Sequence, residues 1–314
     1  MRQALLAGPE KIEVREVPLP EPGPGEVLVR VRACGVCASE VHKWRGAYGR
    51  FPDLLGHEPA GEVAGLGEGV AGWRAGDRVA GLCQGAMAEY AVVRADRLAR
   101  LPDELPFREG LGEPLACVMS GMWRTGIGLG DRAAVVGLGF MGLLSLVVAR
   151  LKGPALLVGI DPRPDMRELA LALGADEVYP PELVPAAYRV RGWDEFGRGL
   201  DAAVEASGTQ AGLDLAGEIP GLHGILSIAG WHTGGARRVD MDLWNIKALT
   251  VINAHERREE RMMEAMRAAL ALLTKRRFSM QPLVTNAYSL DQADLAFGDL
   301  VRKPAGFVKA VIEP

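Results

Sequence analysis

The residues best suited to chemistry lie in one short stretch near the start of the chain. Cys37, His57 and Glu58 supply a thiolate, an imidazole and a carboxylate. These donors suit Zn²⁺, a borderline-soft cation that accepts sulfur, nitrogen and oxygen ligands. Ser39 and His42 stand between them, and a hydroxyl followed by an imidazole is spaced like a proton relay. The stretch therefore predicts a metal site with its own proton path.

A glycine-rich motif further along the chain predicts a nucleotide site. It follows the apolar run 133–136 and opens the apolar run 140–151, which is the strand–turn–helix setting of a dinucleotide fingerprint. Its glycines would permit a tight turn, a close approach to the pyrophosphate and close packing of helix on strand. The helix N-terminus would bind the phosphates. The expected cradle is Gly137, Leu138, Gly139, Phe140, Met141 and Gly142.

Asp161 ends the next apolar run and is placed to select the cofactor. A carboxylate there accepts hydrogen bonds from the adenosine ribose and repels a 2′-phosphate, which favours NAD over NADP. Arg163 lies two positions later and softens this preference, because a guanidinium attracts phosphate. The alternative interpretation is that Asp161 caps a turn and that Arg163 is solvated.

Length and composition limit the class of protein. A chain of 314 residues predicts about two domains. Hydrophobic residues make up 48% and charged residues 24%, as in soluble globular proteins. The net charge of −4 and the lack of like-charge blocks give no sign of a nucleic-acid partner. The start lacks the apolar core of a signal peptide, and no apolar run is long enough to span a membrane.

The four cysteines are too few for a disulfide scaffold, so a reducing cytoplasm is expected. Cys34 and Cys37 form a C-x-x-C pair, which can be a redox motif. Because the pair ends a strand, we interpret Cys34 as a packing residue. Cys83 has no partner at metal spacing and is predicted to be buried. Abundant Arg and Pro with scarce Asn are typical of thermophiles, although genomic base composition gives the same bias.

The first 117 residues are predicted to be mostly strand and turn. In the run 26–33, valines alternate with arginines, as in a strand with one buried face. The ranges 60–66 and 88–93 are further candidate strands, and the glycine-rich range 65–76 indicates turns.

Beyond about residue 120, strands alternate with helices, which predicts a parallel, doubly wound sheet. Expected strands are 133–136, 156–160, 177–179, 200–205, 224–229 and 249–253, and expected helices are 140–151 and 165–173. The tail would hold a long helix over 256–276, a strand at 288–290, a helix over 292–300 and a strand over 307–312, and would rejoin the first domain. The predicted domains are residues 1–117 with 255–314, and residues 118–254.

These features together resemble the medium-chain zinc-dependent dehydrogenases, which include alcohol, sorbitol and threonine dehydrogenases. The resemblance covers nearly the whole chain and rests on the glycine fingerprint and on Gly56-His57-Glu58, Gly76-Asp77-Arg78-Val79, Glu113-Pro114-Leu115-Ala116 and Val204-Glu205-Ala206-Ser207-Gly208. It implies an α/β fold with a β-rich GroES-like catalytic domain and a Rossmann domain. It also implies an oxidoreductase of the class EC 1.1.1 that uses zinc and NAD(P).

The resemblance assigns the metal ligands residue by residue. Cys37 and His57 match the cysteine and histidine that bind catalytic zinc, and Glu58 matches an acid that binds or approaches it. Whether Glu58 or water completes the shell stays open. The third protein ligand is a cysteine in simple alcohol dehydrogenases and an acid in the sorbitol-like branch. Glu113 matches that acid, and Cys117, four positions too late, is the alternative.

The same resemblance assigns the relay. Ser39 would touch the substrate hydroxyl, and His42 would pass the proton through the nicotinamide ribose to solvent. Glu40 matches an acid that orients the imidazole of His57. His223, His232 and His255 are expected to be structural, with His232 facing the nicotinamide without being catalytic.

The chain departs from the family in one respect. Many relatives insert a lobe with four closely spaced cysteines that binds a structural zinc. Here the range 77–83 runs almost directly into 85–90, with Cys83 as the one cysteine. One catalytic zinc and no structural zinc are therefore expected.

The expected reaction is hydride transfer between a secondary alcohol and NAD(H). An acid as third ligand favours a polyol, sugar or related hydroxy compound. Trp44, Tyr48 and Trp123 would line the substrate pocket or belong to the core. The alternatives are a zinc-free NAD(P)H-dependent reductase of the same superfamily and a non-enzymatic nucleotide-binding protein. A homodimer or homotetramer is expected, joined through the sheet edge in residues 224–253.

Overall fold

The computed structural model describes all 314 residues, and the chain divides into two compact units. The first unit contains Met1–Ala116 and Arg258–Pro314, and the second contains Cys117–Arg257. The chain re-enters the first unit at Arg258, three residues later than the expected residue 255. The reason is local packing, since the imidazole of His255 meets Trp231 edge-on at 5.3 Å and the guanidinium of Arg257 lies 5.0 Å from the same ring.

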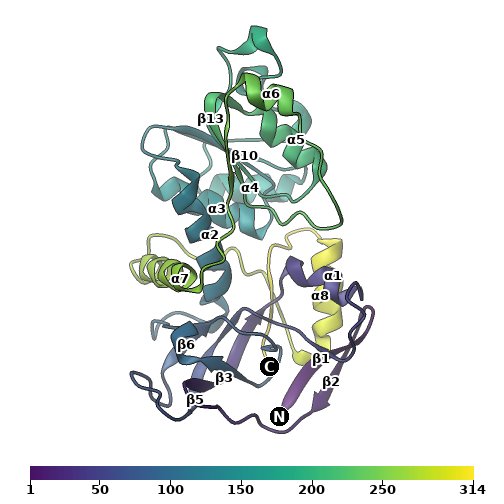
Figure 1. Ribbon diagram of the computed structural model, residues 1–314, viewed down its shortest axis with the longest axis vertical. Coiled ribbons are helices and arrows are strands. Elements are labelled where there is room, and N and C mark those ends of the chain that lie inside the picture. The colour runs from purple at the N-terminus through teal and green to yellow at the C-terminus, as the bar shows by residue number, and fades with distance from the viewer. The chain divides into compact units, whose positions relative to one another are not determined.

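A seven-stranded sheet forms the centre of the first unit (Figure 1). In spatial order its strands are β15 (Asn286–Tyr288), β16 (Ala310–Ile312), β3 (Glu26–Gly35), β5 (Pro59–Leu66), β6 (Arg78–Gly81) and β8 (Leu98–Arg100), and β7 (Tyr90–Arg94) also pairs with β3. All pairings except β15 with β16 are antiparallel. The valines of β3 are buried and Arg30 is exposed, as the alternating pattern predicts.

A smaller three-stranded sheet, which the sequence did not reveal, packs in the same unit. It consists of β1 (Arg2–Gly8), β2 (Lys11–Glu16) and β4 (Asp53–Leu54). Helices α1 (Val41–Trp44) and α8 (Ala293–Arg302) meet beside it, with Trp44 stacked on Phe297 at 5.7 Å between ring centroids. Trp44 is 7% exposed and is therefore a core residue.

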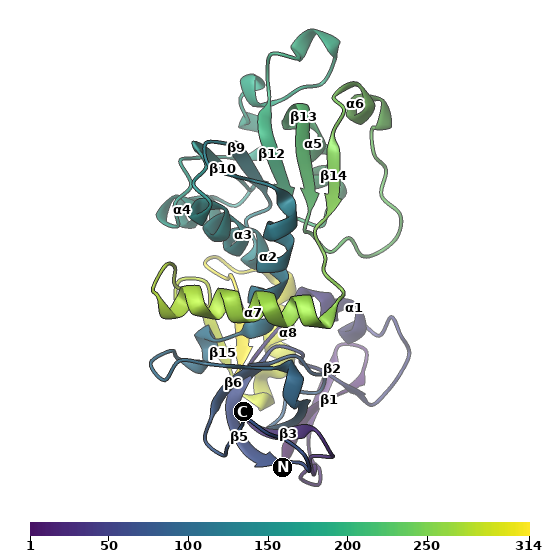
Figure 2. The same cartoon turned by 60° about the vertical axis from the view of Figure 1, so that its left-hand side comes forward.

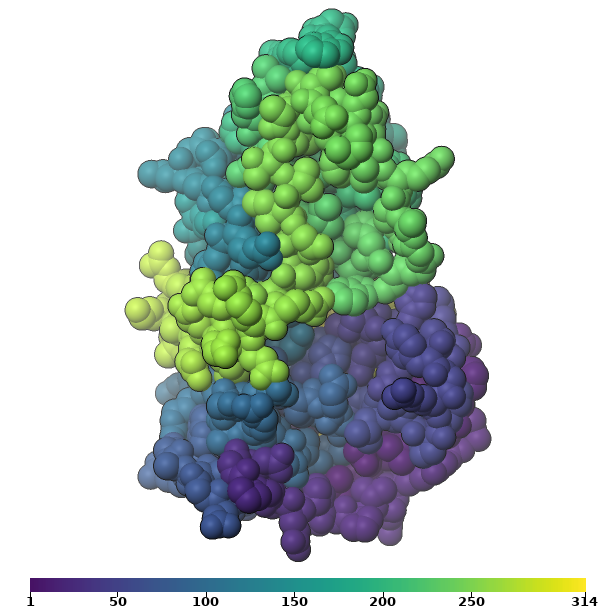
Figure 3. Space-filling view, in the orientation of Figure 1, coloured from purple at the N-terminus to yellow at the C-terminus, as the bar shows by residue number.

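The C-terminal strands differ from the prediction in their bounds. The strand expected at 288–290 is β15, which ends at Tyr288, because Ser289 and Gln292 form a capping box that starts a 3₁₀ turn. The last strand, β16, starts only at Ala310, since Phe307 closes a turn onto the carbonyl of Pro304. The long helix α7 (Glu259–Thr274) has an outer face open to solvent, drawn in lime green in Figure 3.

The second unit holds a six-stranded parallel sheet (Figure 2). The spatial order is β11 (Glu177–Tyr179), β10 (Leu156–Ile160), β9 (Arg132–Val136), β12 (Leu200–Glu205), β13 (Pro220–Ile228) and β14 (Thr250–Asn253). The unit's helices are most of α2 (Gly112–Thr125), α3 (Phe140–Leu151), α4 (Pro164–Ala172), α5 (Gln210–Glu218) and α6 (Met241–Ile246). This strand order is that of the doubly wound dinucleotide-binding fold, which confirms the predicted sheet.

The helices differ in how much apolar surface they offer. Buried residues line much of α3, whereas α7 carries charged residues on its outer face. None of the helices combines the length and the apolar character that crossing a membrane requires.

Lys247 is fully buried and ties the end of α5 to the start of β13. Its Nζ donates hydrogen bonds to the carbonyl oxygens of Gly217, at 2.6 Å, and Pro220, at 2.9 Å. Carbonyls at a helix end lack partners within the helix, so the ammonium satisfies them. Burial lowers the pKa of Lys247 to about 8, although the negative charges of Glu218 and Asp240 act to raise it.

The pKa of Lys247 predicts a pH-dependent stability. Since folding lowers it to about 8 from 10.5, the unfolded chain binds more protons between these pH values, and stability rises with pH. The free energy of unfolding of the wild type, minus that of Lys247→Met, should grow by up to about 2–3 kcal/mol between pH 7.5 and 10.5. Urea unfolding of both proteins at pH 7.5 and at pH 10.5 measures this difference in unfolding free energy. The exposed Lys275→Met is the control, and an equal change there would contradict the assignment.

Candidate functional site

Strand pairing brings the predicted metal ligands together. Near the end of β3, Cys34 pairs with Pro59 at the start of β5 in an antiparallel ladder. Cys37 follows β3, and His57 and Glu58 precede β5, so all three lie at the same end of the ladder. Their ligand atoms lie within 4.8 Å of one another. A cysteine sulfur, an imidazole and a carboxylate from two distant segments thus form one group.

This group fits a zinc ion. Tetrahedral zinc with bonds of about 2.0–2.3 Å holds its ligand atoms roughly 3.3–3.8 Å apart, so small side-chain shifts suffice. Oε2 of Glu58 is buried and lacks a well-formed hydrogen bond, although it lies 2.6 Å from the ammonium of Lys309. Each carboxylate oxygen has two lone pairs, so this oxygen can accept a metal ion besides the ammonium.

Lys309 is the counter-ion of Glu58 and comes from the far end of the chain. It directly precedes β16, which pairs with β3, and its Nζ donates a 2.8 Å hydrogen bond to Oε1 of Glu58. The Glu58 side chain is 1% exposed and that of Lys309 is 4% exposed, so neither charge is solvated. A Cβ at Gly35 would lie 1.8 Å from Oε2 of Glu58, so only glycine leaves room for the carboxylate.

The pKa shifts reflect this concentration of charge. Burial raises the pKa of Glu58, but Lys309 and His57 outweigh it and the net direction is down. Burial lowers the pKa of Lys309, and the charges of Glu58 and Cys37 reverse this. Burial also disfavours the charged form of His57, yet hydrogen bonds to Cys37 and Glu40 raise its pKa to about 12. The group therefore combines buried side chains of opposite charge that stabilise one another.

The predicted supporting residues lie around the ligands. Glu40 is 5% exposed and accepts a 2.9 Å hydrogen bond from the backbone N–H of Gly56, and its carboxylate lies 3.5 Å from Nδ1 of His57. Ser39 Oγ donates to Sγ of Cys37 at 3.2 Å. His42 is half-buried on α1, and no hydrogen bond joins it to Ser39 in this structure.

The two candidates for the third ligand lie on α2. Glu113, in its first turn, is half-buried and close enough to Lys309 for its charge to raise that pKa. Cys117 is also half-buried. Neither belongs to the group of three within 4.8 Å.

The other two cysteines are free thiols next to the core. Cys34 is fully buried, and burial raises its pKa well above the usual value. Cys83 is half-buried rather than buried, and packs against both apolar clusters of the first unit. Burial raises the pKa of Cys83 to about 12. Both are packing residues in this structure.

The glycine fingerprint forms the turn between β9 and α3. Gly137 has φ +92°, and a Cβ there would lie 2.6 Å from the backbone nitrogen of Ser207. A Cβ at Gly142 would lie 1.8 Å from the carbonyl oxygen of Gly137, so helix and turn are in close contact. Gly139 caps α3, and a Cβ there would meet open space. This space lies at the helix N-terminus, where phosphates bind.

Asp161 closes the same turn from β10. It is 6% exposed, and its Oδ2 accepts a 2.7 Å hydrogen bond from the backbone N–H of Leu138. Its Oδ1 accepts a 2.9 Å bond from the N–H of Arg163, whose Nε lies 3.4 Å away. Each carboxylate oxygen has two lone pairs, so further donors can still bind. The guanidinium of Arg167 donates to the carbonyl of Asp161 at 2.7 Å.

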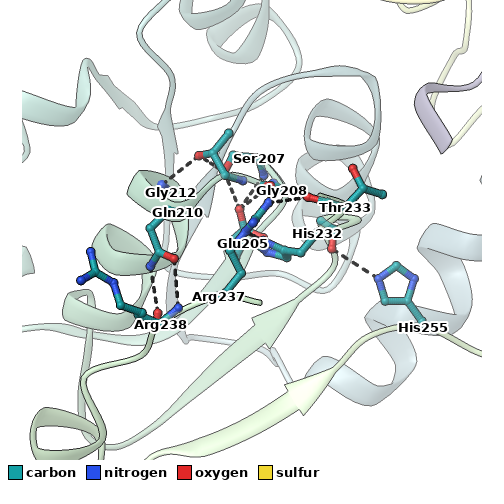
Figure 4. A network of polar contacts seen from close by, with 12 residues as sticks. Glu205, Ser207, Gly208, Gln210, Gly212, His232, Thr233, Arg237, Arg238 and His255 are labelled. Atoms are coloured by element: carbon teal, nitrogen blue, oxygen red, sulfur yellow. Dashed lines mark hydrogen bonds and ion pairs between the residues drawn. The ribbon is translucent and has the colours of Figure 1, made fainter. Parts of the chain in front are cut away.

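The sequence reasoning missed two charged residues of these sites, Lys309 and Glu205. Lys309 had a signal, since it is a lone charge in an apolar final run, and a buried charge needs a partner. Glu205 ends β12 inside a motif noted for the family resemblance, yet its carboxylate is fully buried in a polar network that includes His232 (Figure 4).

The remaining aromatic and histidine candidates include exposed residues and one histidine, His255, at the edge of the network around Glu205 (Figure 4). Tyr48 is 66% exposed and Trp123 39% exposed. His223 is exposed on β13 with a left-handed φ of 57°. His255 is half-buried, with Nε2 3.5 Å from the carbonyl oxygen of Gly230.

Comparison with known proteins places this geometry in a family. Residues 23–103 match the family model described as the alcohol dehydrogenase GroES-like domain. The sorbitol dehydrogenase of Gallus gallus is 31% identical, over 93% of this chain and 90% of its own. The L-threonine 3-dehydrogenase of Pyrococcus horikoshii is 29% identical, over 91% of this chain and 90% of its own. The solved structure of an alcohol dehydrogenase from Thermus sp. ATN1 is 27% identical, has a TM-score of 0.86 and covers 100% of this chain and 99% of that one.

These matches agree with the seven-stranded and six-stranded sheets described above. They confirm the predicted α/β fold with a GroES-like domain and a Rossmann domain. A relative of such identity over nearly the full length shows that the chain belongs to the medium-chain zinc-dependent alcohol dehydrogenase family.

Proposed function

We propose that this protein is a zinc- and NAD-dependent dehydrogenase that interconverts a secondary alcohol and its ketone. The observation that carries the proposal is the grouping of Cys37, His57 and Glu58 within 4.8 Å in a chain that also has a dinucleotide fingerprint. The sorbitol and threonine dehydrogenases among its relatives favour a polyol, a sugar or a related hydroxy compound as substrate.

Cys37, His57 and Glu113 are the proposed ligands of a single catalytic zinc, with Glu58 or water completing the shell. Bound zinc would act as a Lewis acid that polarises an oxygen and lowers the pKa of a hydroxyl. Glu40 would hold the imidazole of His57 in the orientation needed for binding, since its carboxylate lies 3.5 Å from Nδ1. The ion pair with Lys309 competes with the metal for Glu58.

Ser39 and His42 are the proposed proton path. Ser39 would take the proton from the substrate hydroxyl and pass it on to His42. In the present structure Ser39 donates to Cys37, so its hydroxyl must turn to serve the substrate. Histidine is the side chain suited to proton transfer near neutral pH.

The dinucleotide would bind along residues 137–142, with Asp161 accepting the adenosine ribose hydroxyls. Arg163, whose Nε lies 3.4 Å from that carboxylate, would weaken the selection against NADP. The nicotinamide supplies the redox chemistry, because it accepts or gives the hydride.

Two further features belong to the proposal. The exposed edge strand β14, which pairs with β13 alone, would join copies of the chain into a dimer or tetramer. The short connection between β6 and β7 contains a single cysteine, Cys83, which supports one zinc per chain.

The zinc ligands can be tested by substitution. Cys37→Ser and Glu113→Gln should each lower zinc affinity by about 100-fold or more, because a lost ligand costs more than a lost orienting residue. Metal analysis of dialysed protein and NADH formation at 340 nm measure the effect. Cys117→Ser is the matched control and should retain metal and activity. Turnover that survives complete zinc removal would favour the zinc-free reductase.

The cofactor preference can be tested at the turn after β10. Asp161→Ser should shift the ratio of kcat/KM for NAD⁺ to that for NADP⁺ toward NADP⁺ by about tenfold or more, because a carboxylate repels the 2′-phosphate. Arg163→Gln should shift the ratio the other way. Titrations with NADH and NADPH provide a readout independent of turnover. An unchanged ratio in Asp161→Ser would refute this role.

The Lys309–Glu58 pair can be tested through stability. Lys309→Met leaves a buried carboxylate without its counter-ion and should cost about 3–5 kcal/mol of unfolding free energy. Denaturant unfolding measures it. The double substitution Lys309→Met with Glu58→Gln should recover much of the loss, since no buried charge then remains unpaired. A Lys309→Met protein as stable as the wild type would show that the pair is solvated in solution.

A further inference from the structure

Glu205 is a fully buried carboxylate that the proposed reaction does not use. It ends β12, and its Oε1 accepts hydrogen bonds from the backbone N–H groups of Ser207, at 2.7 Å, and Gly208, at 3.0 Å. The hydroxyl of Ser207 donates to the same oxygen at 2.5 Å. Oε2 lies 2.8 Å from Nε2 of His232 (Figure 4). Because a buried charge is costly unless paired, this carboxylate fixes two loops at once.

His232 joins Glu205 to Arg237 through its two ring nitrogens. Nε of Arg237 lies 3.2 Å from Nδ1 of His232 and can only donate, so Nδ1 must be the acceptor. The ring proton is therefore on Nε2, which donates to Glu205. Nη2 of Arg237 also donates to the carbonyl oxygens of Thr233, at 2.8 Å, and Gly208, at 3.4 Å. The loop after β13 is thus tied to the loop after β12.

Both loops lie where this type of sheet binds its ligand. The strand order reverses between β9 and β12, and in open α/β sheets ligands bind outside the carboxyl ends of the strands at that reversal. Glu205 pairs with Val136 at the end of β9, directly before the fingerprint. A Cβ at Gly137 would lie 2.6 Å from the backbone nitrogen of Ser207, so the turn touches the loop that Glu205 holds.

The glycine-containing middle of the loop over residues 231–237 has few other restraints. Gly234 and Gly235 have φ values of +84° and +117°, and a Cβ at either would meet nothing within 4 Å. Beyond the loop, the side-chain amide of Gln210 bonds to the backbone N–H and carbonyl of Arg238. The side chain of Trp231 is exposed at the start of the loop. Its indole meets His255 edge-on and lies 5.0 Å from the guanidinium of Arg257, so the start of the loop is also held from that side.

We propose that His232 is a positioning residue for the nicotinamide dinucleotide. Its ring holds residues 231–237 between Glu205 and Arg237, so that this loop borders the cofactor before the cofactor binds. Preforming a loop removes the entropy cost of ordering it on binding and so raises affinity. This inference rests on the proposed function, because it requires a dinucleotide at the carboxyl edge of the sheet.

Two substitutions at position 232 separate this role from simple packing. In His232→Gln the side-chain amide has both a donor and an acceptor and can replace both contacts, whereas His232→Leu has neither. Titration of each protein with NADH, followed by tryptophan fluorescence and by calorimetry, needs no substrate. The dissociation constant should rise about tenfold in His232→Leu, as expected for the loss of a charge-assisted hydrogen bond, and stay near the wild-type value in His232→Gln.

A second pair of substitutions keeps the proposal testable if a variant at position 232 fails to fold. Arg237→Gln keeps the bond between Glu205 and His232 and should also weaken NADH binding. Arg238→Gln makes the same charge change one residue along, at an exposed side chain, and should bind as the wild type does. When NAD⁺ is varied at a fixed, saturating concentration of the alcohol, the folded variants should show a raised KM for NAD⁺ and a nearly unchanged kcat.

The outcomes are distinct. Wild-type protein that binds neither NADH nor NADPH would refute the proposed function, and this inference with it. If the wild type binds NADH and Arg237→Gln binds it with the same affinity, the positioning role is refuted but the proposed function is not. The role also fails if Arg238→Gln weakens binding as much as Arg237→Gln, or if His232→Gln is as weak as a folded His232→Leu.

Discussion

The antiparallel pairing of β3 with both β5 and β16 is the constraint on which the metal centre depends. Pairing with β5 sets Cys37 against His57 and Glu58, and pairing with β16 delivers Lys309 to the same point. Three chain segments thus meet at one end of a sheet whose register is fixed by its buried valines. A shift of one residue in either ladder would move the side chains to opposite faces and disperse the group.

Buried charge organises both sites, and each buried carboxylate is compensated differently. Glu58 faces a buried ammonium, Glu40 accepts a backbone N–H beside an imidazole, and Glu205 accepts three donors from one short loop and a fourth from His232. Such groups are costly to bury without partners, so each restricts its surroundings to one arrangement. This explains why glycine stands at position 35, where any Cβ would displace the Glu58 carboxylate.

In the second unit, the fold itself prepares the dinucleotide site. Parallel strands of the observed order leave their carboxyl ends at one edge, and the turn over Gly137 is closed there by Asp161 from β10 and by the loop after β12. The backbone N–H of Leu138 is already bonded to Asp161, so the turn is rigid before any ligand arrives. The metal ligands, in contrast, lie within 4.8 Å of one another, and a bound zinc ion would bring them closer together.

The sequence by itself determined the parts that follow local rules. Local sequence patterns predicted β10, α3 and β12 with the bounds observed, and the parallel sheet was predicted from the alternation of strands and helices. Residue types alone singled out Cys37, His57 and Glu58. Only the tertiary structure decided the long-range contacts: the hairpin β1–β2, the stacking of Trp44 on Phe297, the pairing of Lys309 with Glu58 and the chain of contacts from Glu205 to Arg237. The physical reason is that local periodicity reports which face of an element is buried, whereas the partner of a buried charge is set by strand register and loop path between segments far apart in the chain.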